Sequence, residues 1–358
     1  MKRLTLKSAL VGAALLASAA GAYAQDLTGK VYLLVPNVTT VRWAKFDAPY
    51  IKEALKKRAP GIELEVLNAN DNVQQQVSQA EAAIANGALG IIIVAVDPAQ
   101  TSSILAKADA DGVPLVTYTH DPGNGPVPYH VVMLNKEIGE AHGKLIAENL
   151  PEHRPVRLAY MLGDPKFKFY FDQMEGFEKY LGPLIKDGTV EIVCRADAML
   201  YLPQNAQKNM EQCLTKTGDQ LDGVVVMNDD TGGGVIAALS AQDLVGKVKI
   251  YGGYDATLEG IQRVLANWQE ADMAPSYRAM ADTAAELILA QIEKKDPPKD
   301  LINGTWDNGF VKGGIPTAYT HQVLITRENV QETVIDAGLF TKEEVCSGIA
   351  KDAPFCTK

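Results

Sequence analysis

Asn228 and Asp255 are the residues of this chain best placed for binding chemistry. Asn228 directly follows the apolar run 223–227, and Asp255 follows a second run, 249–253. A helix-length segment separates them, so the pattern indicates one βαβ unit. Ligands of open parallel sheets bind outside the carboxyl ends of the strands, where this amide and carboxylate would meet a small polar ligand. Both residue types also suit helix N-caps, so spacing alone leaves the two roles open.

Aromatic residues gather in comparable connecting positions. The segment 167–171 (FKFYF) follows the turn 163–165, and Trp43 and Tyr201 also lie between predicted elements. Such rings could cover the C–H faces of a small ligand while polar groups fix its hydroxyls. Packing in the core of a lobe is the alternative for each ring.

Signatures of catalysis and of cofactor binding are missing from the sequence. There is no Gly-x-Ser-x-Gly, no phosphate loop, no His-Glu-x-x-His, and no Gly-x-Gly-x-x-Gly between a first strand and a helix. We therefore expect a binding protein without a cofactor. An enzyme that uses Asp255 or His120 as a base is the alternative, but it lacks a paired nucleophile or metal set.

The first 24 residues are typical of an export signal. Lys2 and Arg3 precede an apolar run, 9–20, and small residues surround the expected cleavage site after Ala24. No later apolar stretch approaches the ~20 residues that span a bilayer, so we expect no membrane insertion.

Length and charge narrow the class of protein further. Removing 24 of the 358 residues leaves 334, and a chain of this length favours two lobes. The leader carries three basic residues and no acidic ones, so its loss changes the formal charge from −10 to −13. A chain this acidic is a poor partner for nucleic acid or anionic membranes.

Four cysteines lie in the exported part, where an oxidising compartment allows them to pair. Among the three possible connectivities we predict the pairs that are near in sequence, Cys194 with Cys213 and Cys346 with Cys356. A zinc site is the competing interpretation, but neither a Cys-x-x-Cys motif nor clustered histidines support it.

Apolar runs alternate with amphipathic, helix-length segments, which is typical of a doubly wound α/β fold. A first series of four strands is expected at 31–36, 63–68, 91–96 and 114–118. A second series is expected at 131–134, 158–162, 190–194, 223–227 and 249–253. The tail 296–319 predicts irregular surface structure before a last strand at 321–326.

Several segments together carry a family resemblance. They are 42–45 (RWAK), 202–206 (LPQNA), 228–234 (NDDTGGG), 238–242 (ALSAQ) and 283–286 (TAAE). With them, over essentially the whole exported chain, the sequence resembles the periplasmic sugar-binding proteins of ABC importers, in the ribose, arabinose and xylose group.

The resemblance implies two Rossmann-like lobes joined by three crossovers, the type I periplasmic binding protein fold. The amino-terminal lobe would comprise 25–133 and 273–318, and the carboxy-terminal lobe 134–272 and 319–358. It also implies a periplasmic monomer that closes on a neutral monosaccharide or polyol and delivers it to an ABC membrane permease. A sensory binding protein for a chemoreceptor or histidine kinase, or a binder of another small molecule, would share this cleft.

The resemblance also implies a set of ligand-binding residues. They are Arg42, Trp43, Lys45, Thr119, His120, Tyr170, Phe171, Tyr201, Asn228, Asp255 and Asp272. Thr119 and His120 replace an Asp-Arg pair that grips the sugar in the xylose group, so two fewer formal charges would face the ligand. For His120 a structural loop role stays open, and Asp272 would bond either ligand or hinge backbone. The extension 343–358 exceeds what the family predicts.

Overall fold

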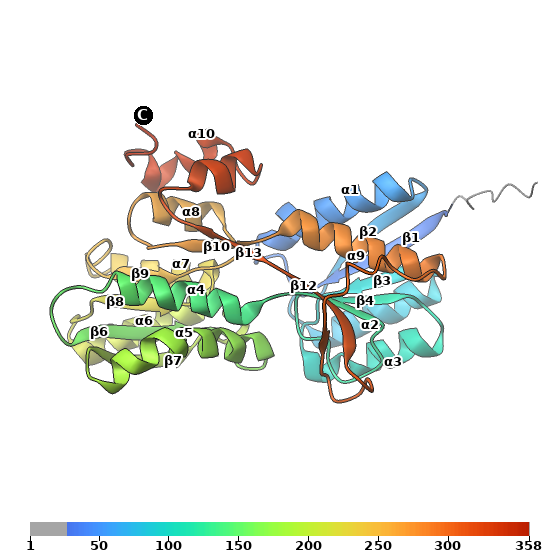
Figure 1. Cartoon of the computed structure of the whole chain (residues 1–358), viewed down its shortest axis with the longest axis horizontal. Coiled ribbons are helices and arrows are strands. Elements are labelled where there is room, and N and C mark those ends of the chain that lie inside the picture. Colours follow the sequence, from blue (N-terminus) through green and yellow to red (C-terminus); the bar gives the residue numbers. More distant parts are fainter. Residues whose placement is uncertain (1–26, 358) are drawn as a thin grey trace, which may run out of the picture.

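The computed structural model describes residues 27–357 and shows two α/β lobes joined by a narrow hinge (Figure 1). The predicted leader and its cleavage site after Ala24 lie outside the described residues. No helix within the described range has the length and apolar character needed to cross a membrane.

The first lobe is built on a seven-stranded sheet with the order β11-β12-β5-β4-β3-β1-β2. Its strands are β1 (Gly29–Val35), β2 (Ile62–Asn68), β3 (Gly90–Ile93), β4 (Leu115–Tyr118), β5 (Tyr129–Met133), β11 (Gly304–Trp306) and β12 (Ile315–Thr320). Its helices are α1 (Ala48–Arg58), α2 (Val73–Ala85), α3 (Ser102–Ala110) and α9 (Tyr277–Ile292). All neighbouring strands are parallel except β11, which pairs antiparallel with β12.

Helices cover both faces of this sheet because its strands are apolar on both sides. Val31, Leu33 and Val35 of β1 pack with α1 and α9, whereas Tyr32 and Leu34 pack with α2 and α3. Successive side chains of a strand point to opposite faces, so one short apolar run serves two cores.

The second lobe has a four-stranded parallel sheet with the order β7-β6-β8-β9. Its strands are β6 (Val156–Leu162), β7 (Val190–Asp197), β8 (Gly223–Val226) and β9 (Lys249–Gly252). Its helices are α4 (Asn135–Glu148), α5 (Lys168–Lys186), α6 (Pro203–Thr217), α7 (Asp229–Ser240) and α8 (Leu258–Leu265). Helices α4 and α5 approach so closely that a Cβ on Gly139 would lie 1.9 Å from the carbonyl oxygen of Gln173, so this position requires glycine.

The chain passes between the lobes in three places. It leaves β5 for α4, returns through β10 (Asp272–Pro275), and leaves β12 for β13 (Gln322–Ile325). Strands β10 and β13 pair antiparallel and form the hinge ribbon.

Two strand predictions are wrong. The run 131–134 was expected to open the second series, but β5 hydrogen-bonds to β4 and β12 and therefore completes the first sheet. The tail 296–319 was expected to be irregular, but it contains β11 and β12, which extend that sheet. The Pro, Gly and Asn residues of this tail favour turns, so the local sequence did not predict two short strands. These strands form because they pair with strands of the first sheet in the tertiary fold.

The last part of the chain packs over the hinge at α8. It comprises the short π-helix η4 (Gln331–Asp336), α10 (Lys342–Val345) and the turn η5 (Gly348–Ala350). Phe340 and Val345 of this segment share an apolar cluster with Ile261 of α8 and with Phe46 of the first lobe. The side-chain amide of Gln262 donates to the Glu344 carbonyl at 3.1 Å and to the Ser347 hydroxyl at 3.0 Å.

The predicted disulfide pairing is confirmed. Cys194 is bonded to Cys213, which ties β7 to α6, and Cys346 is bonded to Cys356 within the terminal segment. These bonds exclude the alternative in which the cysteines bind zinc.

Candidate ligand-binding site

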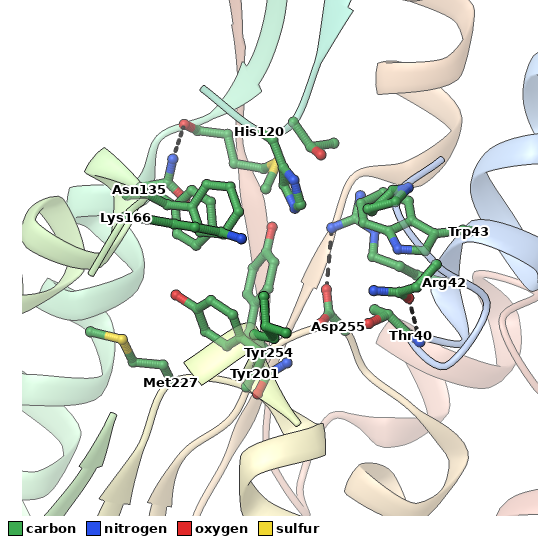
Figure 2. Close-up of a pocket in the computed structure, with 18 of the residues that line it drawn as sticks. Thr40, Arg42, Trp43, His120, Asn135, Lys166, Tyr201, Met227, Tyr254 and Asp255 are labelled. Carbon is green, nitrogen blue, oxygen red and sulfur yellow. Dashed lines mark hydrogen bonds and ion pairs between the residues drawn. The ribbon is translucent and has the colours of Figure 1, made fainter. Parts of the chain in front are cut away.

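A cavity of about 90 Å³ lies between the lobes, at the carboxyl ends of both parallel sheets (Figure 2). A buried water needs roughly 10–15 Å³ by this measure, so the cavity has room for roughly six to nine waters, or one small organic molecule. Seven of the eleven predicted residues line it: Arg42, Trp43, Thr119, His120, Tyr201, Asn228 and Asp255.

Arg42 is the charged centre of the cavity. It precedes the short π-helix η1 (Trp43–Asp47), which places Arg42 beside the buried carboxylate of Asp47. The Arg42 Nε and Nη2 atoms donate to the two oxygens of Asp47 at 2.9 and 3.2 Å, while Nη1 donates to Asp255 Oδ1 at 3.2 Å. Burial alone would lower the pKa of Arg42, but Asp47 and other nearby groups outweigh it and raise that pKa well above its ordinary value.

Asp255 and Asn228 lie where the βαβ argument predicts them, after β9 and β8. Asn228 also caps α7, because its Oδ1 accepts from the Thr231 backbone N–H at 3.0 Å. Its amide Nδ2 makes no hydrogen bond to any part of the chain that the structure describes, so the cap leaves a donor available to the cavity. Burial raises the pKa of Asp255 to about 6, although Arg42 opposes this shift.

Aromatic rings from both lobes surround the cavity. Phe167 lies 4.6 Å from the His120 ring and stacks on Phe169 at 4.9 Å, and Phe169 lies 5.9 Å from Tyr201. Trp43 contacts His120 edge-on at 5.7 Å. Of the segment 167–171, which was predicted to lie beside a ligand site, Phe167 and Phe169 line the cavity.

Tyr170 and Phe171 do not line the cavity, which corrects their assignment. They belong to α5, where Phe169 and Gln173 face the cavity one turn apart. Tyr170 faces the core of the second lobe and donates from its hydroxyl to Asp197 at 2.8 Å, while Phe171 is 57% exposed. The sequence indicated the correct segment but not its rotation about the helix axis.

Lys45 and Asp272 also lie outside the cavity. The Nζ atom of Lys45 lies 3.7 Å from Glu344 and 4.1 Å from the centre of the Phe340 ring. Asp272 is buried in the hinge strand β10, where its Oδ1 accepts from the Met273 N–H at 2.7 Å. Of the two roles left open for Asp272, the structure therefore favours hinge backbone.

Unpaired polar atoms concentrate in the cavity. Twelve buried polar side-chain atoms of the described chain have no hydrogen-bond partner, and six of these belong to cavity residues. They are the Trp43 Nε1, the Asn135 Oδ1, the Gln173 Oε1 and the hydroxyls of Thr119, Tyr201 and Tyr254. The set contains donors, acceptors and hydroxyls that can act as either. Such groups are costly to bury unless something bonds to them.

The charged cavity side chains, by contrast, all have partners. Lys166 Nζ lies 3.8 Å from Asp164 Oδ2, and Asp71 accepts from the Asn37 amide at 2.9 Å. Arg42 and Asp255 are bonded to each other. Within residues 27–357 no cluster of His, Cys, Asp and Glu is arranged to hold a metal ion. The cavity is therefore suited to an uncharged ligand that carries several hydrogen-bonding groups.

Comparison with known proteins identifies the family. The family described as periplasmic binding protein domain matches residues 31–296, about three quarters of the chain. The chain belongs to this family. The expectation drawn from the sequence motifs is thereby confirmed, including the type I periplasmic binding protein fold.

Two curated relatives of this periplasmic binding protein are similar over nearly their whole length. The D-xylose-binding periplasmic protein of Escherichia coli is 28% identical over 331 residues, which cover 92% of this chain and 96% of the relative. That of Haemophilus influenzae is 29% identical over 344 residues, covering 95% and 99%. An ABC transporter solute-binding protein from Clostridium phytofermentans, solved with bound β-D-glucose, superposes with a TM-score of 0.78 at 23% identity, covering 88% of this chain and 100% of that one. This last similarity shows the fold.

Further cavity residues of this periplasmic binding protein do not belong to the predicted ligand-binding set. They are Pro36, Asn37, Thr40, Asp71, Val96, Met133, Asn135, Lys166, Phe167, Phe169, Gln173, Leu200, Met227 and Tyr254. Of these, the two phenylalanines lie in the aromatic segment 167–171 that the sequence analysis singled out. Asn37 and Asp71 follow β1 and β2, so the rule applied to Asn228 would have found them. Asn135 and Gln173 lie on α4 and α5, and no local signal marks which face of a helix meets the other lobe.

Proposed function

We propose that this protein captures one neutral monosaccharide or polyol between its lobes and delivers it to an ABC permease. The observation that carries the proposal is the cluster of six unpaired polar atoms in one interlobe cavity. Sugars and polyols are small, uncharged and rich in hydroxyls, each of which donates and accepts. Such a ligand would complete the hydrogen bonds of the cavity without adding an unpaired charge.

Seven predicted residues form the core of the proposed binding set. Arg42, Trp43 and Asn228 would donate, Asp255 would accept, and the hydroxyls of Thr119 and Tyr201 would do either. The rings of Phe167 and Phe169 would cover the apolar face of the ligand together with Trp43. His120 would accept a hydrogen bond.

Capture requires the lobes to move, and the contacts across the cavity support a closing motion. The Thr40 hydroxyl donates to Asp230 Oδ2 at 3.3 Å, and the Lys168 backbone N–H donates to Asp121 Oδ2. Each contact joins the first lobe to the second. A ligand that touches both lobes binds the closed form more tightly than the open one, and this difference drives closure.

The proposal extends to location and partners. The D-xylose-binding relatives are periplasmic proteins, and we infer the same compartment for this chain, with cleavage after Ala24. We infer that it acts as a monomer, binds without catalysing a reaction, and docks on a membrane permease.

Thermal melting tests the binding function. The mature protein is unfolded and refolded to remove carried-over ligand, then melted with pentoses, hexoses, pentitols, tetritols and inositols. A ligand at 100 times its Kd adds about 2.7 kcal/mol, which raises Tm by several degrees. A panel without any stabilising member would overturn the proposal, as would turnover of a bound sugar detected by NMR.

Two variants and one control locate the site. Asp255→Ala is expected to abolish the shift. Asn228→Ser keeps a side chain that caps α7 but lacks the amide donor, so it should weaken binding with little loss of Tm. Asp109→Ala alters an exposed carboxylate on α3 and should leave the shift unchanged.

A further inference from the structure

His120 occupies a fixed position on the cavity wall. It follows β4 through Thr119, whose φ of 60° turns the chain sharply at the end of the strand. Three rings hold the imidazole, with centroid distances of 5.7 Å to Trp43, 4.6 Å to Phe167 and 5.8 Å to Phe169. The side chain therefore has little freedom to rotate.

One hydrogen bond determines which imidazole nitrogen carries the proton. The Nδ1 atom of His120 lies 2.7 Å from the carbonyl oxygen of Ala95. A carbonyl oxygen only accepts, so Nδ1 must be the donor. In a neutral imidazole the other nitrogen, Nε2, then has a lone pair and no hydrogen. Nε2 makes no hydrogen bond within residues 27–357, and Figure 2 shows the ring at the cavity.

The surroundings keep this imidazole neutral. The pKa of His120 is lowered to about 4, chiefly by burial and also by the positive charges of Arg42 and Lys166, against the opposing effect of the Ala95 hydrogen bond. Asp121, the next residue, is the nearest acid along the chain, but its Oδ2 accepts from the Lys168 backbone N–H and burial raises its pKa to about 6. At neutral pH, Nε2 is thus an acceptor that has no partner.

We propose that His120 is a specificity-determining residue that accepts a hydrogen bond from a hydroxyl group of the bound ligand. This inference rests on the proposed function. In the resemblance to the xylose group, His120 stands where an arginine donates to the sugar. The exchange therefore inverts the polarity of this contact from donor to acceptor. Ligands with a hydroxyl at this point would be selected, and analogues with a deoxy, ether or carbonyl group there would be rejected.

Nitrogen NMR of the imidazole rings tests the inference without knowledge of the ligand. Protein stripped of ligand is labelled with ¹⁵N-histidine and recorded at pH 7, and His120 is assigned from the resonances that disappear in His120→Gln. We expect a neutral ring with the proton on Nδ1. A proton on Nε2, or a doubly protonated ring, would overturn the inference whatever the protein binds.

Ligand addition and two variants complete the test. A stabilising sugar or polyol from the melting panel should shift the Nε2 resonance and leave Nδ1 protonated. His120→Phe keeps a ring but removes the acceptor, and should weaken binding of that compound at least tenfold. His120→Gln restores an acceptor, and should recover most of the loss. Equal affinity of His120→Phe and wild type would show that the ring only packs.

The outcomes separate this inference from the proposed function. A compound that stabilises the protein but leaves Nε2 unchanged contradicts the role of His120 while capture of a hydroxyl-rich ligand stands. A panel that never stabilises the protein overturns the ligand class, and the inference falls with it.

Discussion

Arg42 Nη1 lies 3.2 Å from Asp255 Oδ1, although the two residues are 213 positions apart and belong to different lobes. Both side chains are buried and both line the cavity. A ligand that bonds to Asp255 therefore also meets the guanidinium that bridges to it. We therefore propose that ligand binding and lobe closure share this electrostatic contact.

The position of Arg42 depends on Asp47, which is fully buried and also accepts from the Tyr118 hydroxyl at 2.7 Å. We expect Asp47→Asn to lower the free energy of unfolding by about 3 kcal/mol, because it leaves a buried arginine partly unpaired. Ligand affinity should fall with it. Urea unfolding and calorimetric titration provide the two measurements. Lys30→Gln, which breaks the exposed Lys30–Glu65 pair, is the control and should cost less than ~1 kcal/mol.

Asp230 gives stability a pH dependence. Burial, together with Asp255 and Asp229, raises its pKa to about 7 from 3.8. Between these values the folded state binds more protons than the unfolded state, so this carboxyl lowers stability progressively as pH rises from about 4 to 7. The free energy of unfolding of Asp230→Asn should therefore increase relative to that of wild type as pH rises, by at most about 4 kcal/mol. Urea unfolding of both proteins at pH 5 and pH 8 measures this difference in the free energy of unfolding. Histidine titration is common to both proteins and cancels in the difference. An equal difference at both values would exclude the raised pKa.

Trp43 should report ligand binding by fluorescence. It is the cavity tryptophan, and its buried Nε1 has no partner within residues 27–357. Trp43→Phe should abolish the change in emission and weaken binding roughly fivefold, because it removes one hydrogen bond worth ~1 kcal/mol. Trp306→Phe alters a tryptophan of β11 outside the cavity, so it should keep both the change in emission and the affinity for the ligand. Retention of the full fluorescence response in Trp43→Phe would place the ligand elsewhere.

We expect loss of either disulfide to lower the stability of the fold, and loss of only one of them to change the arrangement of the lobes. Their sequence separations of 19 and 10 residues predict that each stabilises the fold by ~3 kcal/mol. The double variants Cys194→Ser/Cys213→Ser and Cys346→Ser/Cys356→Ser should lose similar stability. Only the second should also change the radius of gyration without ligand, measured by small-angle X-ray scattering, because only its segment lies over the hinge. Identical scattering profiles would contradict this assignment.

Much of the fold could be predicted from the sequence because its signals are local. Apolar runs such as 223–227 mark buried strands, and the polar residues after them mark the edge where a site forms. Strands β11 and β12 escaped prediction because their pairing partners lie far away in the chain. The role of β5 was misjudged for the same reason, since local sequence does not show which sheet a strand joins.

The site was predictable where a residue follows a strand and less so where it lies on a helix. Position placed Asn228 and Asp255 at the carboxyl ends of their strands, and the resemblance then favoured a ligand role over helix capping. Tyr170 and Phe171, by contrast, were chosen in place of Phe169 and Gln173. To predict which face of α5 lines the cavity, one must know how the helix is rotated about its axis relative to the other lobe. Long-range packing determines that rotation. The position of Lys45 outside the cavity has the same origin, because its neighbours Phe340 and Glu344 lie near the far end of the chain.

The terminal segment touches the first lobe through Phe340 on Phe46, at a ring distance of 5.8 Å, and through Glu344 near Lys45. It also packs against α8 and the hinge strand β13. The apparent affinity for any cargo includes the free energy that separates the unliganded open and closed populations. A residue that contacts both lobes can alter that population ratio without meeting the cargo. In this protein, sequence changes in the tail could therefore retune the working concentration range while the chemical selectivity of the cavity stays unchanged.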